Sequence, residues 1–394
     1  MSNHPPIQIP YGHQFIDEAD IAAVEAVLRS DYLTQGPAIE RFERKVAEYC
    51  EARYAVAVSS ATAALHLGAL ALGVKPGDQV YTSPITFVAT ANCARYCGGE
   101  PYWVDIDPAT ANMSAQNLEG RLTLGDMAEV PMRLIIPVHL AGQPCDMQAI
   151  HALAQRFNLS VMEDAAHALG ARYRGRPVGC CQYSDLTVFS FHPVKIVTTG
   201  EGGVITTNRD DLYQRLLRLR NHGITRDPLY LKNPAHGPWY YEQIELGYNY
   251  RMTDIQAALG ASQMDKLDQF VRRRRELADR YDQLLKGYPV TPLARSPHAE
   301  SSWHLYIIRL NLKEIKKTHL QVFKDMRWQG IGVQLHYIPL FLHPYYRNPA
   351  IKEEESYKEA TRYYAEAMTL PLYYGMTEQQ QNRVVEALFQ ALWS

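Results

Sequence analysis

Short apolar runs alternate with helical patterns along the first half of the chain. The runs predict strands, and apolar positions at helical spacing between several of them, as over Met147–Phe157, predict helices. Such alternation is typical of a mostly parallel sheet covered by helices on both faces. We therefore expect an α/β fold with seven strands, at Tyr54–Ser59, Gln79–Thr82, Pro101–Asp105, Leu134–His139, Leu159–Glu163, Leu186–Ser190 and Gly203–Thr207.

The pattern changes towards both ends of the chain. Residues 1–15 look like an irregular arm that docks elsewhere, and Asp17 predicts the cap of a helix over Ala19–Leu28. A helix from Thr253 towards Leu285 is long enough to link two domains. We expect a large domain over residues 16–255, and a linking helix with a small α+β domain over 256–394. The small domain has expected strands at Ser301–Leu310 and Ile331–Leu335 and expected helices at Lys313–Gln329 and Glu355–Ala367.

Composition excludes several classes of protein. Of 394 residues, 46% are hydrophobic and 21% are charged, and the net charge of -2 lacks the basic excess of a nucleic-acid-binding protein. The one dense basic cluster, Arg272–Arg275, lies in a helical pattern and is interpreted as a solvated helix face. No apolar segment is long enough to span a bilayer, and the first residues lack a secretory pattern. The six cysteines have neither zinc-site spacing nor the density of a disulfide scaffold, so we expect a cytoplasmic protein without a metal site.

A single lysine stands between two apolar strands in the segment Leu186–Asn208. Lys195 follows the strand that ends at Ser190, and the glycine-rich run TTGEGG leads into the next strand. Most lysines in such turns extend into solvent. A lysine that is buried without a partner shifts towards the neutral amine, which is nucleophilic. Lys195 is therefore a candidate nucleophile if a second group supports it.

The second group comes from a strand about thirty residues upstream. There the segment LSVMEDAAHALG ends its strand in two acids and places Asp164 and His167 beyond the carboxyl end, where open α/β sheets bind ligands. A lysine and an aspartate at one sheet edge form the pair that pyridoxal phosphate needs. The lysine bonds the cofactor covalently, and the aspartate pairs with the protonated ring nitrogen. Either residue alone would be a weak signal.

Several segments resemble those of the DegT/DnrJ/EryC1/StrS sugar aminotransferases, which use pyridoxal phosphate to aminate nucleotide-linked keto sugars. These segments are EDAAHALG, FSFHPVK and TTGEGG, and the resemblance runs from YLTQGP near the start to MTLPLYYGMT near the end. It implies a fold-type I aminotransferase with a seven-stranded, mostly parallel sheet and a small C-terminal α+β domain. It also implies a homodimer whose active sites are shared between subunits.

The resemblance gives roles to residues that are ambiguous by themselves. Ser59–Thr62 open a helix expected over Thr62–Leu72, as caps or as a phosphate site, and Phe87 suits a core or a cofactor stack. By resemblance, the cofactor is bound by Ser60, Ala61, Thr62, Phe87, Asp164, His167, Ser190 and the catalytic Lys195, while Asn249 reaches the cofactor phosphate of the neighbouring subunit. The substrate is then contacted by Tyr11, Asp31, Tyr32, Leu33, Thr34, His336 and Tyr337, although the loop Ser30–Pro37 alone would read as a connector.

Within the family, YLTQG, SPITFVATAN and FSFHPVK are similar to segments of the C4 aminotransferases of pseudaminic acid synthesis. This similarity implies UDP-2-acetamido-2,6-dideoxy-β-L-arabino-hex-4-ulose as amino acceptor and L-glutamate as amino donor. One alternative is another UDP- or dTDP-sugar aminotransferase, such as one that makes 4-amino-4-deoxyarabinose. Another is a regulator that binds the cofactor without catalysis. A sugar 3-dehydratase of the family would commonly carry histidine in place of the lysine, so Lys195 argues against that activity.

Overall fold

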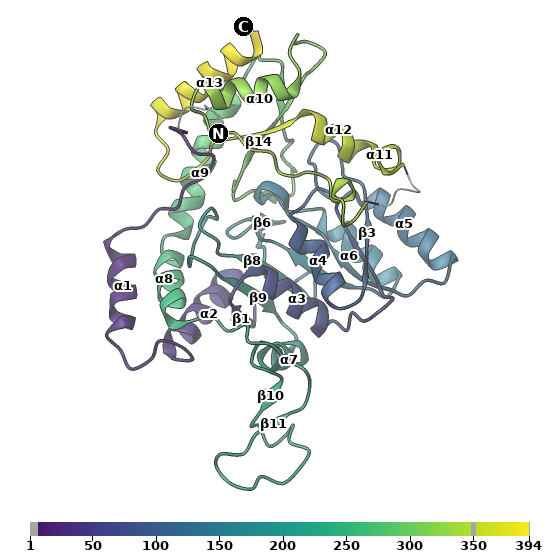
Figure 1. Ribbon diagram of the computed structural model, residues 1–394, viewed down its shortest axis with the longest axis vertical. Helices are drawn as coiled ribbons and strands as arrows, with labels where there is room; N and C mark the ends of the chain where they lie inside the picture. Colours follow the sequence, from purple (N-terminus) through teal and green to yellow (C-terminus); the bar gives the residue numbers. More distant parts are fainter. Residues whose placement is uncertain (1–6, 348–351, 394) are drawn as a thin grey trace.

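The computed structural model describes residues 7–347 and 352–393 of the chain. Seven strands form one sheet in the order β1-β9-β8-β5-β4-β2-β3 (Figure 1). Neighbouring strands are parallel except at β9, which is antiparallel to β1 and β8. The predicted sheet is confirmed, with strands β1 Tyr54–Val58, β2 Gln79–Thr82, β3 Glu100–Trp103, β4 Met132–Ile136, β5 Ser160–Asp164, β8 Leu186–Ser190 and β9 Gly203–Thr207.

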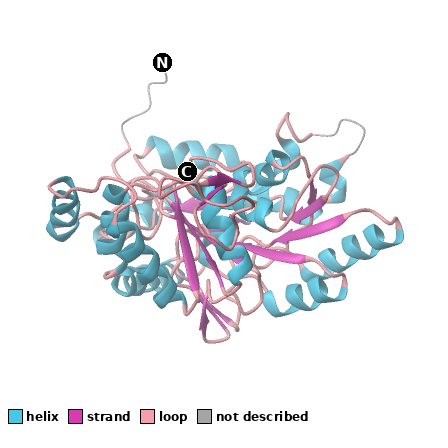
Figure 2. Ribbon diagram, turned by 90° about the horizontal axis from the view of Figure 1, so that it is seen from below, coloured by secondary structure: helices cyan, strands magenta, loops and turns pink. Residues whose placement is uncertain are grey.

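Helices surround this sheet, as Figure 2 shows. The helices in the first 284 residues are α1 Glu18–Leu28, α2 Pro37–Cys50, α3 Ala61–Ala71, α4 Val88–Tyr96, α5 Ala115–Met127, α6 Met147–Arg156, α7 Asp210–Arg220, α8 Asp254–Met264 and α9 Leu267–Leu284. Those nearer the C-terminus are α10 His319–Trp328, α11 Glu353–Ser356, α12 Lys358–Glu366 and α13 Glu378–Trp393. Among the described residues, none of these helices has the length and apolar content needed to cross a membrane.

Successive strand residues pack against different helices because their side chains alternate between the faces of the sheet. Val188 and Met162 belong to a buried cluster with residues of α3, α4 and α7. The next residue along β8, Phe189, instead packs with α2, α8 and α9, while Val161 packs with α5 and α6. The strands are therefore buried on both faces, which explains why they read as continuous apolar runs rather than as alternating ones.

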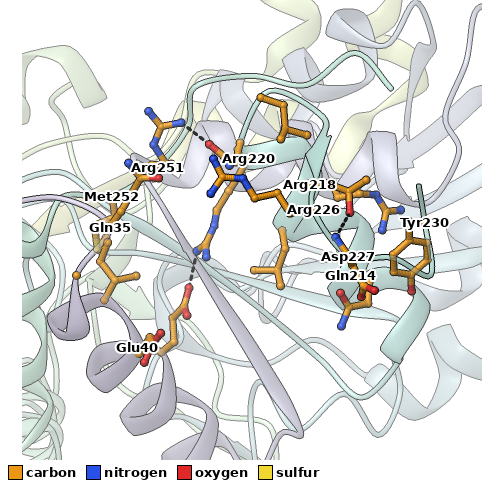
Figure 3. Close-up of a pocket in the computed structure, with 17 residues that line it drawn as sticks. Gln35, Glu40, Gln214, Arg218, Arg220, Arg226, Asp227, Tyr230, Arg251 and Met252 are labelled. Atoms are coloured by element: carbon orange, nitrogen blue, oxygen red, sulfur yellow. Dashed lines mark hydrogen bonds and ion pairs between the residues drawn. The ribbon is translucent and has the colours of Figure 1, made fainter. Parts of the chain in front are cut away.

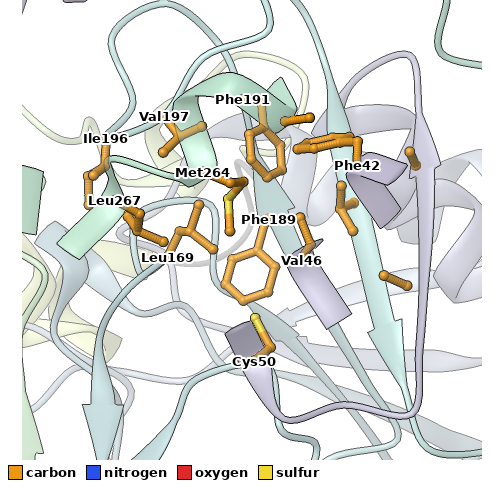
Figure 4. Close-up of a cluster of buried hydrophobic side chains, with 14 of the residues drawn as sticks. Phe42, Val46, Cys50, Leu169, Phe189, Phe191, Ile196, Val197, Met264 and Leu267 are labelled. Carbon is orange, nitrogen blue, oxygen red and sulfur yellow. The ribbon is translucent and has the colours of Figure 1, made fainter. Parts of the chain in front are cut away.

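The turn that carries Lys195 is anchored in one of these clusters (Figure 4). Phe191 before the lysine and Ile196 and Val197 after it are all buried. The Phe191 ring meets the edge of Phe42 from α2 at a centroid distance of 5.1 Å. Because apolar side chains hold both sides of the turn, the lysine between them has little freedom to swing away from the sheet.

A second, smaller sheet lies near the C-terminus, with strands β12 Val290–Pro292, β14 Tyr306–Leu310 and β15 Ala367–Leu370. It packs with α9, α10 and α13 around a separate buried cluster, which supports the proposed small domain; the boundaries 16–255 and 256–394 stay a prediction. One strand prediction in this part of the chain was too long and another was wrong. Only Tyr306–Leu310 of the first segment is a strand, and Ile331–Leu335 makes only isolated bridges, Ile331 to Ile9 and Gln334 to Thr369.

The predicted linking helix is divided into two. Thr253 caps α8 as expected, with a reciprocal bond to Gln256, but the helix ends at Met264 and α9 begins at Leu267. Lys266 at the break forms ion pairs with Asp17 at 2.8 Å and with Asp20 at 2.7 Å. The ion pairs tie the break to the start of α1, whose cap at Asp17 is confirmed. The break was not predicted because its partners lie far away in the sequence.

The interpretation of Arg272–Arg275 as a solvated face was wrong for one residue. Arg274 is almost fully buried and donates through Nη1 to the carbonyls of Trp303, His304 and Leu372 at 3.0–3.3 Å. Within the described residues it has no carboxylate partner, and burial lowers the pKa of Arg274 to about 10. The reason for the error is that α9 turns this position towards the protein, which a charge run by itself does not reveal.

The described part of the N-terminal arm docks on the C-terminal part of the chain. Ile9 bridges to Ile331, and the Gly332 N–H donates to Ile9 O at 2.7 Å. Further along the arm, the Leu372 N–H donates to Tyr11 O at 3.0 Å. The arm thereby brings Tyr11 to the edge of the large sheet; residues 1–6 lie outside the described part.

A buried carboxylate links α8 to the start of α2, a helix that the sequence pattern did not predict. Asp254 Oδ2 accepts from the Gly36 N–H at 2.8 Å, and Oδ1 accepts from the Ala38 N–H at 2.9 Å. Gly36 caps α2 without a side chain of its own, so Asp254 satisfies first-turn donors in its place. A side chain at position 36 would collide with Tyr32 and Asp254, which explains the glycine.

We expect Asp254→Asn to lower the free energy of unfolding by about 1–3 kcal/mol, because an amide can accept only one of the two N–H bonds and presents a donor to the other. Urea unfolding at fixed protein concentration measures the change. Asp265→Asn, at an exposed position that pairs with Lys45, should change it by less than about 0.5 kcal/mol. Equal losses in both variants would contradict this role for Asp254.

Candidate active site

A cavity of about 450 Å³ lies at the carboxyl ends of the parallel strands. Segments that follow β1, β2, β4, β5 and β8 all contribute to its wall, and the C-terminal part of the chain closes another side. This is the edge at which open α/β sheets bind ligands. The cavity collects most of the predicted site residues, namely Tyr11, Ser60, Ala61, Thr62, Phe87, Asp164, His167, Ser190, Lys195, His336 and Tyr337.

Lys195 lies in the cavity wall and is partly open to the cavity. Surrounding protein atoms lower the pKa of Lys195 to about 8, and the Asp164 carboxylate opposes this shift. The backbone N–H of Lys195 donates to the backbone carbonyl of His192 at 2.9 Å, and this bond closes the turn. A substantial fraction of the amine is therefore neutral at mildly alkaline pH, as a nucleophile requires.

Asp164 ends β5 beside β8 and is buried. Its Oδ2 accepts from the Thr90 hydroxyl at 2.6 Å, and Thr90 is in turn bonded to Thr86 at 2.7 Å. Oδ1 accepts from the Ala166 N–H at 3.1 Å. Both threonines lie in the segment SPITFVATAN, but the sequence analysis selected only Phe87 from it. Their hydroxyls orient the carboxylate that the predicted cofactor nitrogen would meet.

His167 uses both ring nitrogens within the protein. Nδ1 accepts from the Ala141 N–H at 3.3 Å, so the proton is on Nε2, which lies 3.1 Å from the Tyr337 hydroxyl. Burial, Lys195 and His336 lower the pKa of His167 well below its usual value. His167 is therefore a neutral ring whose Nε2–H points at Tyr337, and a bond to a bound ligand would have to share or replace that contact.

The helix start predicted to bind phosphate is capped by Ser60 and still has free backbone donors. Ser60 Oγ caps α3 by accepting from the Ala63 N–H at 3.1 Å, as the cap interpretation requires. The N–H groups of Ala61 and Thr62 precede the first intrahelical bond, and both residues line the cavity. Gly203 of β9 allows the close approach, since a Cβ there would collide with Ser60. The helix start therefore offers backbone donors and a positive dipole end to an anion.

Two further aromatic rings line the cavity. Phe87 is 58% exposed in the single chain, and its ring centroid lies 6.3 Å from that of Tyr337. The ring centroid of Tyr11 lies 5.5 Å from that of His336, and His336 Nδ1 is bonded to Thr369 at 2.8 Å. The exposed face of Phe87 suits stacking on a flat heterocycle.

His304 is a site residue that the sequence analysis missed. It lines the cavity and is almost fully buried, its ring lies 4.4 Å from that of His167, and its Nδ1 has no hydrogen-bond partner among the described residues. Burial first, and then His167 and Lys195, lower the pKa of His304 well below its usual value. A polar residue inside the apolar run SSWHLYIIRL was the signal that could have revealed it.

The remaining predicted residues lie outside this cavity. Asn249 pairs with Asn221, and Thr34 bridges to Thr253, so the two predicted segments lie side by side on the surface. Next to them is a second cavity of about 400 Å³, lined among others by Gln35, Arg218, Arg220, Arg226 and Arg251 (Figure 3). The residues that a single chain does not bring to the first cavity, all exposed, are Asp31, Tyr32, Leu33, Thr34 and Asn249.

The residues of the first cavity fit pyridoxal phosphate. A partly neutral lysine and a buried carboxylate lie in its wall, a helix start offers donors for a phosphate, and an exposed aromatic ring lines the same cavity. The unpartnered Nδ1 of His304 indicates that the wall has polar capacity left for a ligand. Among the described residues, no group of three or more His, Cys, Asp or Glu is placed to hold a metal ion.

The chain is similar to known proteins over nearly its whole length. The model of the DegT/DnrJ/EryC1/StrS aminotransferase family matches residues 14–389. The spore coat polysaccharide biosynthesis protein SpsC of Bacillus subtilis is 37% identical over 383 residues, covering 96% of both chains. The UDP-4-amino-4,6-dideoxy-N-acetyl-beta-L-altrosamine transaminase of Campylobacter jejuni is 35% identical over 385 residues, covering 98% of this chain and 97% of that one. Spr1654 of Streptococcus pneumoniae, named as a sugar aminotransferase and solved in its PMP form, superimposes with a TM-score of 0.88 at 32% identity, covering 98% of this chain and 99% of that one.

We expect the cofactor-free protein to capture added pyridoxal phosphate about tenfold faster at pH 9 than at pH 7, with a midpoint near pH 8. Only the neutral amine attacks, and the pKa of Lys195 is lowered to about 8, so the neutral fraction rises through this range. Borohydride reduction followed by mass analysis of the peptide that contains Lys195 measures the rate. Lys195→Ala should remain unlabelled. A midpoint near the ordinary lysine value would show that burial does not shift this amine.

Proposed function

Since the chain belongs to the DegT/DnrJ/EryC1/StrS aminotransferase family, we propose that it aminates C4 of a UDP-linked 4-keto-6-deoxy-N-acetylhexosamine. The chain is a pyridoxal-phosphate-dependent sugar aminotransferase. The proposed acceptor is UDP-2-acetamido-2,6-dideoxy-β-L-arabino-hex-4-ulose and the proposed donor L-glutamate, as in pseudaminic acid biosynthesis. The observation that carries the proposal is the 35% identity, over nearly the full length of both chains, to a transaminase named for the corresponding 4-amino sugar. The cytoplasmic location stays a prediction.

Lys195 is the proposed catalytic residue. The bound cofactor supplies an electron sink next to the carbon–nitrogen bond that changes. Lys195 Nζ would hold the cofactor covalently at rest, and a pKa of about 8 lets the same nitrogen accept a proton and return it near neutral pH. Asp164, oriented by Thr90 and the Ala166 N–H, would keep a proton on the ring nitrogen.

The other cavity residues would bind and orient. The first-turn donors of Ala61 and Thr62, with the hydroxyls of Ser60 and Ser190, would hold the phosphate. His167 would contact the ring hydroxyl of the cofactor through Nε2–H, in place of its present bond to Tyr337. Phe87 would stack on the cofactor ring. Tyr11, His336 and Tyr337 would contact the sugar nucleotide.

A homodimer would complete the site. Asn249 and the Asp31–Thr34 loop lie together on the surface and outside the cavity of their own chain. Tyr32 and Leu33 in this loop are 56% and 50% exposed in the single chain, and a second copy that packs on this surface would cover them. We propose that Asn249 of each subunit faces the cavity of the other.

Two alternatives to this function remain, a different sugar substrate and a regulatory role without catalysis. SpsC, a spore coat polysaccharide protein, is as similar to this chain as the named transaminase is, so another nucleotide-sugar aminotransferase, of the 4-amino-4-deoxyarabinose type for example, is the second candidate. A cofactor-binding regulator would need the same neutral lysine to capture the cofactor, so the pKa of Lys195 does not argue against it. It is disfavoured by the match to an aminotransferase family and by the relative that is named as a transaminase. Discrimination between sugars depends on a few polar contacts.

We expect the purified enzyme to aminate the proposed UDP-4-keto sugar with glutamate, and to react more slowly with dTDP-linked and pentose analogues. Mass and NMR analysis of the products identifies the sugar and the configuration at C4. Lys195→Ala should lower turnover more than about a thousandfold while circular dichroism shows an unchanged fold. Amination of the pentose analogue in preference to the hexosamine would favour the second candidate, and retained activity of Lys195→Ala would refute the catalytic assignment.

Mixed dimers test the shared site. Lys195→Ala and Asn249→Ala homodimers should each be impaired, whereas a dimer with one copy of each carries both changes in one site and neither in the other. We therefore expect the mixed dimer to recover about half of the wild-type rate. Unfolding and refolding the two variants together, with differently tagged chains, isolates the mixed dimer. No recovery would place Asn249 in its own subunit's site, and an unimpaired Asn249→Ala homodimer would place it outside both sites.

A further inference from the structure

The EDAAH segment contains a second carboxylate besides that of Asp164. This residue, Glu163, has no role in the proposed reaction. Glu163 directly precedes Asp164 on β5, and successive side chains of a strand point to opposite faces of the sheet. Asp164 faces the cavity, so Glu163 lies behind it, on the far side of the sheet, and is also buried. Burying a carboxylate costs free energy unless hydrogen-bond donors satisfy its oxygens, so the residues that donate to Glu163 indicate why it is kept there.

Three side chains donate to Glu163. Oε2 lies 2.7 Å from Nε2 of His139, a residue with no exposed surface. Oε1 accepts from the hydroxyls of Ser184 at 2.5 Å and Thr187 at 2.8 Å. Within the described residues, His139 is the only potentially cationic partner of this carboxylate.

His139 forms hydrogen bonds with both acidic residues of β5, with the side chain of Glu163 and with the backbone of Asp164. Its Nδ1 accepts from the Cys145 N–H at 3.1 Å, so the proton must be on Nε2, which donates to Glu163. The backbone N–H of the same residue donates to Asp164 O at 3.1 Å. The ring is therefore held in one tautomer, and the end of β5 is bound to one residue twice, through the Glu163 side chain and through the backbone of Asp164.

The turn that follows His139 carries this constraint to His167. Leu140–Gly142 form a 3-10 turn, and its Ala141 N–H donates to Nδ1 of His167 at 3.3 Å. That bond places the His167 proton on Nε2, towards Tyr337 and the cavity. A displaced turn would free Nδ1 and allow the other tautomer.

We propose that Glu163 is a positioning residue which, through His139, sets the place of Asp164 and the tautomer of His167. The inference rests on the proposed function, because it assumes that these two side chains meet the cofactor. Glu163 touches neither cofactor nor substrate. It acts from behind the sheet, by hydrogen-bond geometry rather than by its charge.

This distinction predicts opposite results for two substitutions. Leucine at position 163 leaves the His139 Nε2–H without an acceptor in a buried site, so the ring and the following turn are released. Glutamine can still accept from His139 through its oxygen, while its amide donates to the oxygens of Ser184 and Thr187. Glu163→Gln should therefore preserve the arrangement that Glu163→Leu destroys.

The experiment titrates cofactor-free protein with pyridoxal phosphate, following absorbance for affinity and the circular dichroism of the bound cofactor for its orientation. Glu163→Leu should weaken binding about tenfold or more and change the dichroism, whereas Glu163→Gln should stay within about threefold of the wild type. Ser184→Ala, which removes a donor on the side away from His139, should also stay within about threefold.

Asp78→Leu is the matched control for general destabilisation. Asp78 is likewise a buried carboxylate, but it lies before β2 at the opposite end of the strands, where it accepts from the Lys75 N–H and from Arg133. The Asp78→Leu variant should have a lower thermal stability, but the affinity for pyridoxal phosphate and the circular dichroism of the bound cofactor should not change. If Glu163→Leu does not fold, His139→Asn breaks the same contact from the other side and should weaken binding to the same degree.

Two outcomes would overturn the inference. One is binding by Glu163→Leu, or by His139→Asn in its place, within about threefold of the wild type. The other is a loss in Asp78→Leu as large as that in Glu163→Leu, since destabilisation alone would then explain both. If wild-type protein itself does not bind pyridoxal phosphate, the proposed function fails first. Normal wild-type binding with an unaffected Glu163→Leu removes only the role of Glu163.

Discussion

The site depends on the parallel pairing of β5 with β8. Met162 is paired with Leu186 and Asp164 with Val188, so the two strands end at the same edge of the sheet. The carboxylate of one and the lysine that follows the other then reach a common cavity. A slip of one residue in this register would turn Asp164 to the far face and put Glu163 in its place. The chemistry therefore rests on a backbone register that the apolar core on both faces maintains.

Few of the side chains that line the cavity are charged. Lys195, Asp164 and the exposed Glu201 line it, whereas burial lowers the pKa of His336 to about 3 and those of His167 and His304 well below the ordinary value. Neutral histidines can each donate and accept one hydrogen bond without competing with the carboxylate for the amine. In a site of low dielectric, the interaction of the buried Asp164 carboxylate with a protonated ligand is stronger than it would be in water.

Segments from the whole chain converge on this edge. The arm supplies Tyr11, which is tied to Leu372, and the C-terminal part supplies His336, whose carbonyl accepts from the Tyr363 hydroxyl at 2.6 Å. Backbone and buried side-chain bonds of this kind hold residues that come from opposite ends of the sequence. Asn249 and the Asp31–Thr34 loop beside it lie outside the first cavity of their own chain, which is the arrangement that a shared site would need.

The sequence by itself determined the sheet, the arm and the pair of Lys195 with Asp164. These follow from local properties: strands appear as apolar runs, caps as short polar residues, and ligand-binding groups stand where parallel strands end. Only the tertiary structure decided that Arg274 is buried, that Asp254 caps α2, that Thr90 and His304 join the site, and that Ile331–Leu335 is not a strand. Each of these depends on a partner distant in the chain, and residue spacing along a sequence does not record which faces will meet in the folded protein.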